Sequence, residues 1–148
     1  MDTVNGTNIL HILNGDCALD GWHQAGFAGE VLVWRENYLL GTLPENCTMT
    51  EFNRIRAEVL HNCAPEKTVE EIFDGLQEMH RKISSLKSGD KVILWLDCCP
   101  FDQALKHELL KLLQALPERP QIFTVQKDVV WNRAAFLEYR NFEEYLWQ

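Results

Sequence analysis

The segment Lys91–Asp97 constrains the fold more than any other part of the chain. It begins with a charged residue, continues through five large apolar residues in a row and ends at an acidic residue. A short, uninterrupted apolar run is typical of a strand that is buried on both faces, as in parallel sheets covered by helices. We therefore expect this strand to lie at the centre of such a sheet.

Three other short segments have the composition of strands. Each is rich in apolar or β-branched residues, and glycine or proline lies close to one of its ends. The predicted strands are Asn8–Leu13, Glu30–Trp34 and Gln121–Val125.

Segments with helical spacing of apolar residues separate the predicted strands. The sequences Thr48–Glu51 and Thr68–Glu71 both match a capping box, and an apolar stripe follows each of them. A leucine stripe runs from Leu105 to Leu116, with Asp102 placed to cap that helix. A weaker helix is predicted around Ala18–Ala25, because a glycine interrupts it.

Strands that alternate with helices require crossover connections, which favour a parallel sheet with helices on both faces. The sequence therefore predicts a three-layer, Rossmann-like α/β domain with a mainly parallel sheet of about four or five strands. A length of 148 residues suits one domain, 1–148. Residues 128–148 are rich in aromatic side chains, with a helix predicted over 133–146, and we expect this C-terminal segment to be docked.

The charge balance excludes several classes of partner. The chain carries 14 basic and 22 acidic residues, and a net charge of -8 repels phosphate backbones and anionic lipids. We expect no general nucleic-acid binding and no membrane partner.

The start of the chain lacks a basic segment followed by an apolar run, which predicts a cytoplasmic protein. Five cysteines without paired short spacing are expected to be reduced, and no motif designates a cofactor.

Polar residues follow three of the predicted strands. In parallel sheets ligands bind at the carboxyl ends of the strands, so these residues are the candidate ligand-binding site. They are Asn14, Gly15, Asp16, Cys17, Arg35, Glu36, Asp97, Cys98 and Cys99.

Two of these groups have both a structural and a functional interpretation. Gly15 can make a turn while Asp16 caps the next helix, or the loop can cradle a polar or anionic ligand. Arg35 can anchor a carboxylate or phosphate, or it can form a surface ion pair with Glu36 or Asp16. We expect Arg35→Ala to abolish ligand binding with little loss of stability.

The adjacent residues Cys98 and Cys99 allow three interpretations. We expect two buried, inert thiols that fill small spaces. A nucleophilic or redox role is the second interpretation, because a helix N-terminus can lower the pKa of the Cys99 thiol. A metal site with Cys17 or His23 is the third, but no compact ligand spacing supports it, so no metal is assigned. The sequence shows no visible catalytic triad, nucleophile elbow or phosphate loop.

Three segments resemble the bacterial domain-of-unknown-function family 1835. They are His11–Asp16, Gly29–Glu36 and Val92–Asp97, with Asp102-Gln103 after the last. The resemblance implies a Rossmann-like domain with polar groups at the strand ends and no established activity. Relatives have serine where Cys17 stands and Glu-His-Asp where Asp97-Cys98-Cys99 stands. A histidine is lost here, which puts any acid–base or metal chemistry of the family in doubt.

The sequence is consistent with two functions, and whether the protein is an enzyme stays open. The first is binding of a small anionic or nucleotide-like ligand at the carboxyl edge of the sheet. The alternative is a catalytically degenerate interaction or regulatory module that self-associates, as a homodimer, through its aromatic C-terminal segment.

Overall fold

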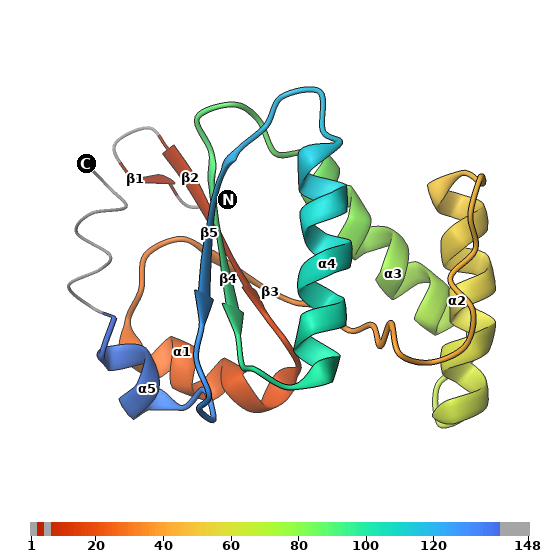
Figure 1. The fold of residues 1–148 in the computed structure, drawn as a ribbon, viewed down its shortest axis with the longest axis horizontal. Helices are drawn as coiled ribbons and strands as arrows, with labels where there is room; N and C mark the ends of the chain where they lie inside the picture. Colours follow the sequence, from red (N-terminus) through yellow and green to blue (C-terminus); the bar gives the residue numbers. More distant parts are fainter. Residues whose placement is uncertain (1–2, 5–6, 140–148) are drawn as a thin grey trace.

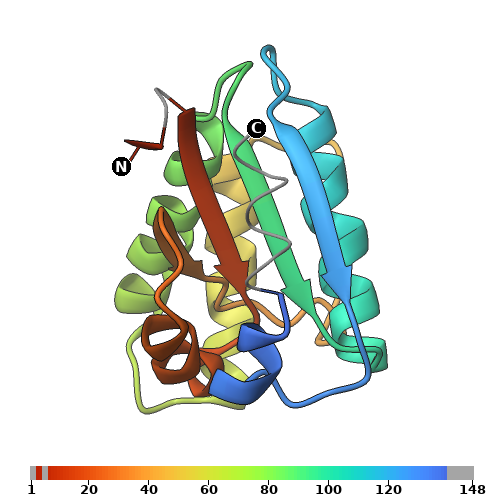
Figure 2. The same ribbon diagram turned by 90° about the vertical axis from the view of Figure 1, so that its left-hand side faces the viewer.

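The computed structural model describes residues 3–4 and 7–139, and its centre is a parallel sheet (Figure 1). Four strands lie side by side in the order β3 (Glu30–Val33), β2 (Thr7–Leu13), β4 (Lys91–Leu96) and β5 (Gln121–Gln126). A short strand that the sequence did not predict, β1 (Thr3–Val4), pairs antiparallel with the start of β2. Figure 2 shows β2, β4 and β5 running in the same direction.

Strand β4 lies inside the sheet, as its sequence predicted. It pairs along its length with β2 on one side and with β5 on the other. All five apolar residues from Val92 to Leu96 are buried. The continuous apolar run is explained by this position, because a strand covered on both faces has no solvent side for polar residues.

Helices cover both faces of the sheet, so the predicted three-layer, Rossmann-like α/β fold is confirmed. On one face lie α1 (Leu19–Ala25), preceded by a 3₁₀ turn at Asp16–Ala18, and α5 (Arg133–Leu137). On the other face lie α3 (Val69–Ser84) and α4 (Pro100–Gln114). Helix α2 (Met49–Cys63) packs against α3, farther from the sheet (Figure 1). No helix of the described residues is long and apolar enough to cross a membrane.

The strands divide their side chains between two cores. Successive residues of a strand point to opposite faces, so Ile9 and Leu13 pack toward α1 and α5 while Leu10 and Ile12 pack toward α3 and α4. Strand β4 does the same with Trp95 and Leu94. The sheet is therefore held on both faces by apolar contacts.

The C-terminal segment packs on the first of these cores as far as the structure describes it. Trp131 and Phe136 are buried and their rings contact Trp95. Helix α5 ends at Leu137, and residues 140–146 of the helix predicted there lie outside the described residues.

Two predicted helix caps are wrong. Cys99, not Asp102, is the N-cap residue of α4, and its Sγ accepts the Asp102 N–H at 3.4 Å. Asp16 caps no helix with its side chain. In both cases the carboxylate has a partner that is distant in the sequence, Asn14 for Asp102 and Arg35 for Asp16.

The chain reverses its direction of winding at β2. From β2 it crosses through α1 to β3, and from β3 it crosses back over β2, through α2 and α3, to β4. The loops after β2 and β4 therefore diverge. Such a switch point is where ligands bind in open parallel sheets.

Candidate functional site

The predicted site residues lie at one edge of the sheet, because the strands that they follow are parallel. Within that edge they do not form one site. Asn14 and Asp97 belong to a cluster at the switch point between β2 and β4, Arg35 belongs to a separate cavity, and Glu36 is in the interior.

The switch-point cluster consists of Asn14, Asp97, Cys99 and Asp102, and hydrogen bonds join its members. The Asp102 carboxylate accepts from the Asn14 side-chain amide and, at 2.6 Å, from the Asp97 N–H. The Asp97 carboxylate accepts the Cys99 N–H at 2.7 Å. Asp102 was missed as a site residue, although the spacing Asp-x-Cys-x-x-Asp was visible in the sequence.

The cluster is acidic and its Asp102 carboxyl is buried. Burial raises the pKa of Asp102 to about 6, against the lowering effect of the bond from the Asp97 N–H, and the nearby charge of Asp97 raises it further. A negatively charged ligand would be repelled here. One ligand atom from each of Asp97, Cys99 and Asp102 lies within 4.8 Å of the others, so this donor set could hold a cation.

The two adjacent cysteines differ from the prediction that both are buried. Cys98 is exposed and Cys99 is half-buried. The hydrogen bond between the Cys99 thiol and the Asp97 carboxylate, with burial, raises the pKa of Cys99. This opposes the thiolate that a nucleophilic role for Cys99 needs.

A small cavity of about 160 Å³ opens beside this cluster. Asn14, Cys17, Asp97 and Asp102 line it together with Trp95 and Trp131. Its volume is below the range typical of ligand pockets, so it suits an ion or a small polar group.

Arg35 and Asp16 form an ion pair on the surface. Their side chains are 54% and 65% exposed, and the Arg35 Nη2 lies 2.6 Å from the Asp16 carboxylate. The predicted surface pair is therefore present. It occupies one nitrogen of the guanidinium, and within the described part of the chain the other guanidinium nitrogens have no hydrogen-bond partner.

Arg35 also lines the cavity that we call the Arg35 cavity, which has a volume of about 320 Å³. The cavity lies between α2, α3 and the segment after β3. Its apolar lining comes mainly from Leu40, Leu60, Ile72, Leu76 and Met79. Its charged lining residues are Arg35, Glu66, Lys67 and Glu71.

Glu36, predicted to bind a ligand, is instead buried in an ion pair with Arg56 of α2. Both side chains are 0% exposed, and Arg56 Nη2 lies 2.7 Å from Glu36 Oε1. A carboxylate that is buried and paired in this way is not available to a ligand. Arg56 was missed because nothing in the sequence distinguishes it from Arg54, the other arginine of the same amphipathic helix.

No family model, curated protein or solved structure matched this chain.

Proposed function

We propose that this chain is a small-molecule-binding domain, and that its ligand is a small anion with an apolar body that occupies the Arg35 cavity. One observation carries the proposal. A guanidinium with unused donors lines a mainly apolar cavity of about 320 Å³ at the carboxyl edge of a parallel sheet.

The charges favour an anion in this cavity over one at the switch point. Arg35 and Lys67 both line the Arg35 cavity. Of its two carboxylates, Glu71 already accepts hydrogen bonds from the N–H and hydroxyl of Thr68. Glu66 and Glu71 offset these two positive charges, whereas the switch-point cluster contains two carboxylates and no basic residue. The Arg35 guanidinium can bind a carboxylate or phosphate through two of its N–H groups.

The volume limits the size of the ligand. A cavity of about 320 Å³ is near the lower end of the range for ligand pockets. A carboxylic acid with a short aliphatic or aromatic body fits this limit, and so does a nucleotide-like ligand such as a nucleoside monophosphate. A dinucleotide does not.

The test is a thermal-shift series at low salt with two anions, octanoate and AMP, and their counterparts octylamine and adenosine. We expect at least one of the anions to stabilise the protein and both counterparts to have no effect. A ligand at 100 times its dissociation constant would stabilise the fold by about 2.7 kcal/mol.

The matched variants are Arg35→Ala and Arg81→Ala. Both arginines form exposed ion pairs, and such pairs typically contribute less than about 1 kcal/mol, so neither variant should lose much stability. We expect Arg35→Ala to abolish the response to the anion and Arg81→Ala to keep it. An unchanged response in Arg35→Ala, or a response to octylamine alone, would contradict the proposal.

The alternative function, self-association through the aromatic C-terminal segment, gains no support from the described aromatic residues. Trp131, Phe136 and Tyr139 pack against Trp95 of their own chain. Phe142, Tyr145 and Trp147 lie outside the described residues. The resemblance to family 1835 stays a prediction. Its three segments contain the whole of β3 and the carboxyl ends of β2 and β4.

A further inference from the structure

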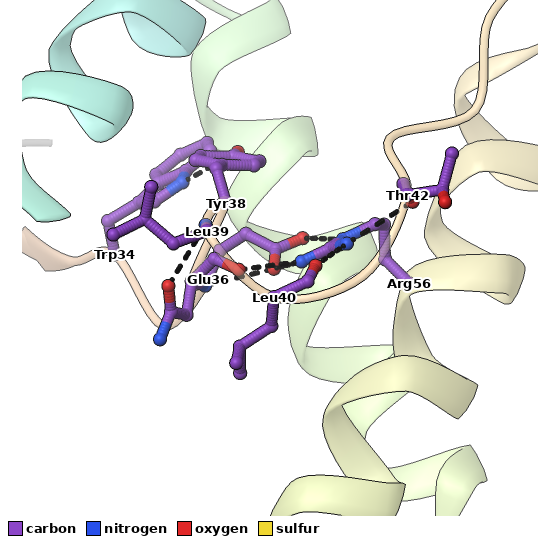
Figure 3. A network of polar contacts seen from close by, with 8 residues as sticks. Trp34, Glu36, Tyr38, Leu39, Leu40, Thr42 and Arg56 are labelled. Atoms are coloured by element: carbon purple, nitrogen blue, oxygen red, sulfur yellow. Dashed lines mark hydrogen bonds and ion pairs between the residues drawn. The ribbon is translucent and has the colours of Figure 1, made fainter.

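Arg56 is a buried charge whose hydrogen-bonding capacity is fully used (Figure 3). Its Nε and Nη2 donate to the two oxygens of Glu36 at 3.0 and 2.7 Å. Nη2 also donates to the Asn37 carbonyl at 2.7 Å, and Nη1 donates to the carbonyls of Leu40 and Thr42 at 2.6 and 3.4 Å. Five donors therefore reach four residues.

All these acceptors belong to one stretch of chain, residues 36–42, which forms neither a helix nor a strand. Such a stretch lacks the regular backbone hydrogen bonds that hold an element rigid. Arg56 supplies bonds from α2 in their place. We call this set of contacts the Glu36–Arg56 clasp.

The clasped segment forms part of the Arg35 cavity. Leu40 is one of the lining residues, and its carbonyl is bound by Arg56. Gly41, at a φ of 63°, lies so close to α2 that a Cβ there would be 2.8 Å from the Val59 side chain. The segment that forms this wall of the Arg35 cavity therefore packs directly against α2.

The clasp also sets the direction of Arg35. Trp34 and Glu36 are buried, whereas the Arg35 side chain between them is 54% exposed, as expected for an extended backbone. The Arg35 N–H donates to Met79 Sδ at 3.3 Å, which fixes the backbone from the other side. Because the clasp holds the Glu36 side chain in the interior, the Arg35 side chain next to it points to the opposite side of the extended backbone.

From this geometry we infer that Arg56 is a positioning residue for ligand binding, because the clasp pre-forms the wall of the Arg35 cavity and aims the Arg35 guanidinium. The inference rests on the proposed function. The burial of the pair is weak evidence for a role in stability, because replacing a buried ion pair with apolar residues of similar volume is often neutral or stabilising. Pre-organisation, by contrast, raises affinity.

The test compares wild type with the double variant Glu36→Leu/Arg56→Met. We expect the denaturation midpoint to change little. Amide hydrogen exchange over residues 36–43 should become at least about tenfold faster, because the loop loses its bonds, while exchange in α4 stays the same. The dissociation constant for octanoate or AMP, whichever binds wild type, should rise at least about tenfold.

Two single variants complete the design. Arg56→Lys keeps the charge but lacks the planar guanidinium with its five N–H donors. The increases in exchange rate and in dissociation constant should therefore be present and smaller than in the double variant. Arg56→Lys also replaces the double variant if that protein fails to fold. Arg54→Lys, at an arginine on the same helix whose pair with Glu70 is exposed, should change neither quantity.

The outcomes separate the two proposals. Unchanged exchange over residues 36–43, or faster exchange with an unchanged dissociation constant, overturns the positioning role. If neither octanoate nor AMP binds wild type, the proposed function fails and the positioning role with it, and the exchange rates then describe only how the segment is held.

Discussion

At the scale of single residues, the buried charge-bearing groups show how the fold controls protonation. His11 lies in β2 and is fully buried. The Trp95 indole N–H donates to Nδ1 of His11 at 3.0 Å, and an indole can only donate, so Nδ1 carries no proton. The ring proton therefore lies on Nε2, which donates to the Ala28 carbonyl at 2.9 Å. Burial lowers the pKa of His11 to about 4, so the ring is neutral at pH 7.

The lowered pKa of His11 predicts a loss of stability in acid. The pKa falls from 6.5 when unfolded to about 4 when folded, so in this range the unfolded state binds the proton more strongly. The contribution of neutral His11 to the free energy of unfolding is fully present above pH 6.5. It is lost as the pH falls toward 4, by up to about 3 kcal/mol. Urea unfolding at pH 7 and pH 4.5 measures this loss.

Carboxylates also titrate in this range, so the prediction is tested as a difference between variants. His11→Gln keeps a donor and an acceptor but does not titrate, and its loss of stability between the two pH values should be smaller than that of wild type. His107→Gln, at an exposed residue of α4, should behave as wild type. Equal losses in all three proteins would contradict a neutral, buried His11.

At the scale of elements, two helices test how much a cap contributes. In α3 the Thr68 hydroxyl accepts the Glu71 N–H at 3.1 Å and the Glu71 carboxylate accepts the Thr68 N–H, which completes a capping box. In α2 the Thr48 hydroxyl accepts the Glu51 N–H at 3.1 Å. The described contacts of α2 do not include the reciprocal bond.

We therefore expect Thr68→Ala to reduce the free energy of unfolding by about 1 kcal/mol, and Thr48→Ala by less. Chemical denaturation of the two variants beside wild type measures both values. The Thr68 hydroxyl also donates to the Glu71 carboxylate at 3.2 Å, a bond that the described contacts of Thr48 do not include, and a larger loss in Thr48→Ala would contradict the expected order.

At the scale of the whole molecule, α5 ties the end of the described chain to the sheet. Phe136 is 0% exposed and contacts Trp95 and Trp131, whereas its neighbour Leu137 is 38% exposed. Phe136→Ala should reduce the free energy of unfolding by about 3 to 5 kcal/mol, because it leaves a cavity in the core. Leu137→Ala is the matched control.

Urea denaturation followed by tryptophan fluorescence and by circular dichroism measures this effect, and the two signals should change together. If Phe136→Ala costs no more than Leu137→Ala, α5 is not part of the cooperative unit, and the domain would then end before it.

The order of strands and helices was predictable from the sequence because the signals for it are local. Apolar runs such as Val92–Leu96 and helical stripes such as the leucines of α4 can be recognised within ten or fifteen residues. Parallel strands then imply that the polar residues after them share one edge. The three-layer fold and the edge that carries the candidate site were therefore predicted.

Only the tertiary structure decided which of those polar side chains are available. Glu36 is paired with Arg56, 20 residues away, and Asp102 accepts from Asn14, 88 residues away. Neither pairing is indicated by spacing or composition, because a buried ion pair or hydrogen bond depends on which surfaces meet when helices pack on the sheet. For this reason the sequence determined the strands, the helices and the edge, while packing alone separated the acidic switch point from the Arg35 cavity.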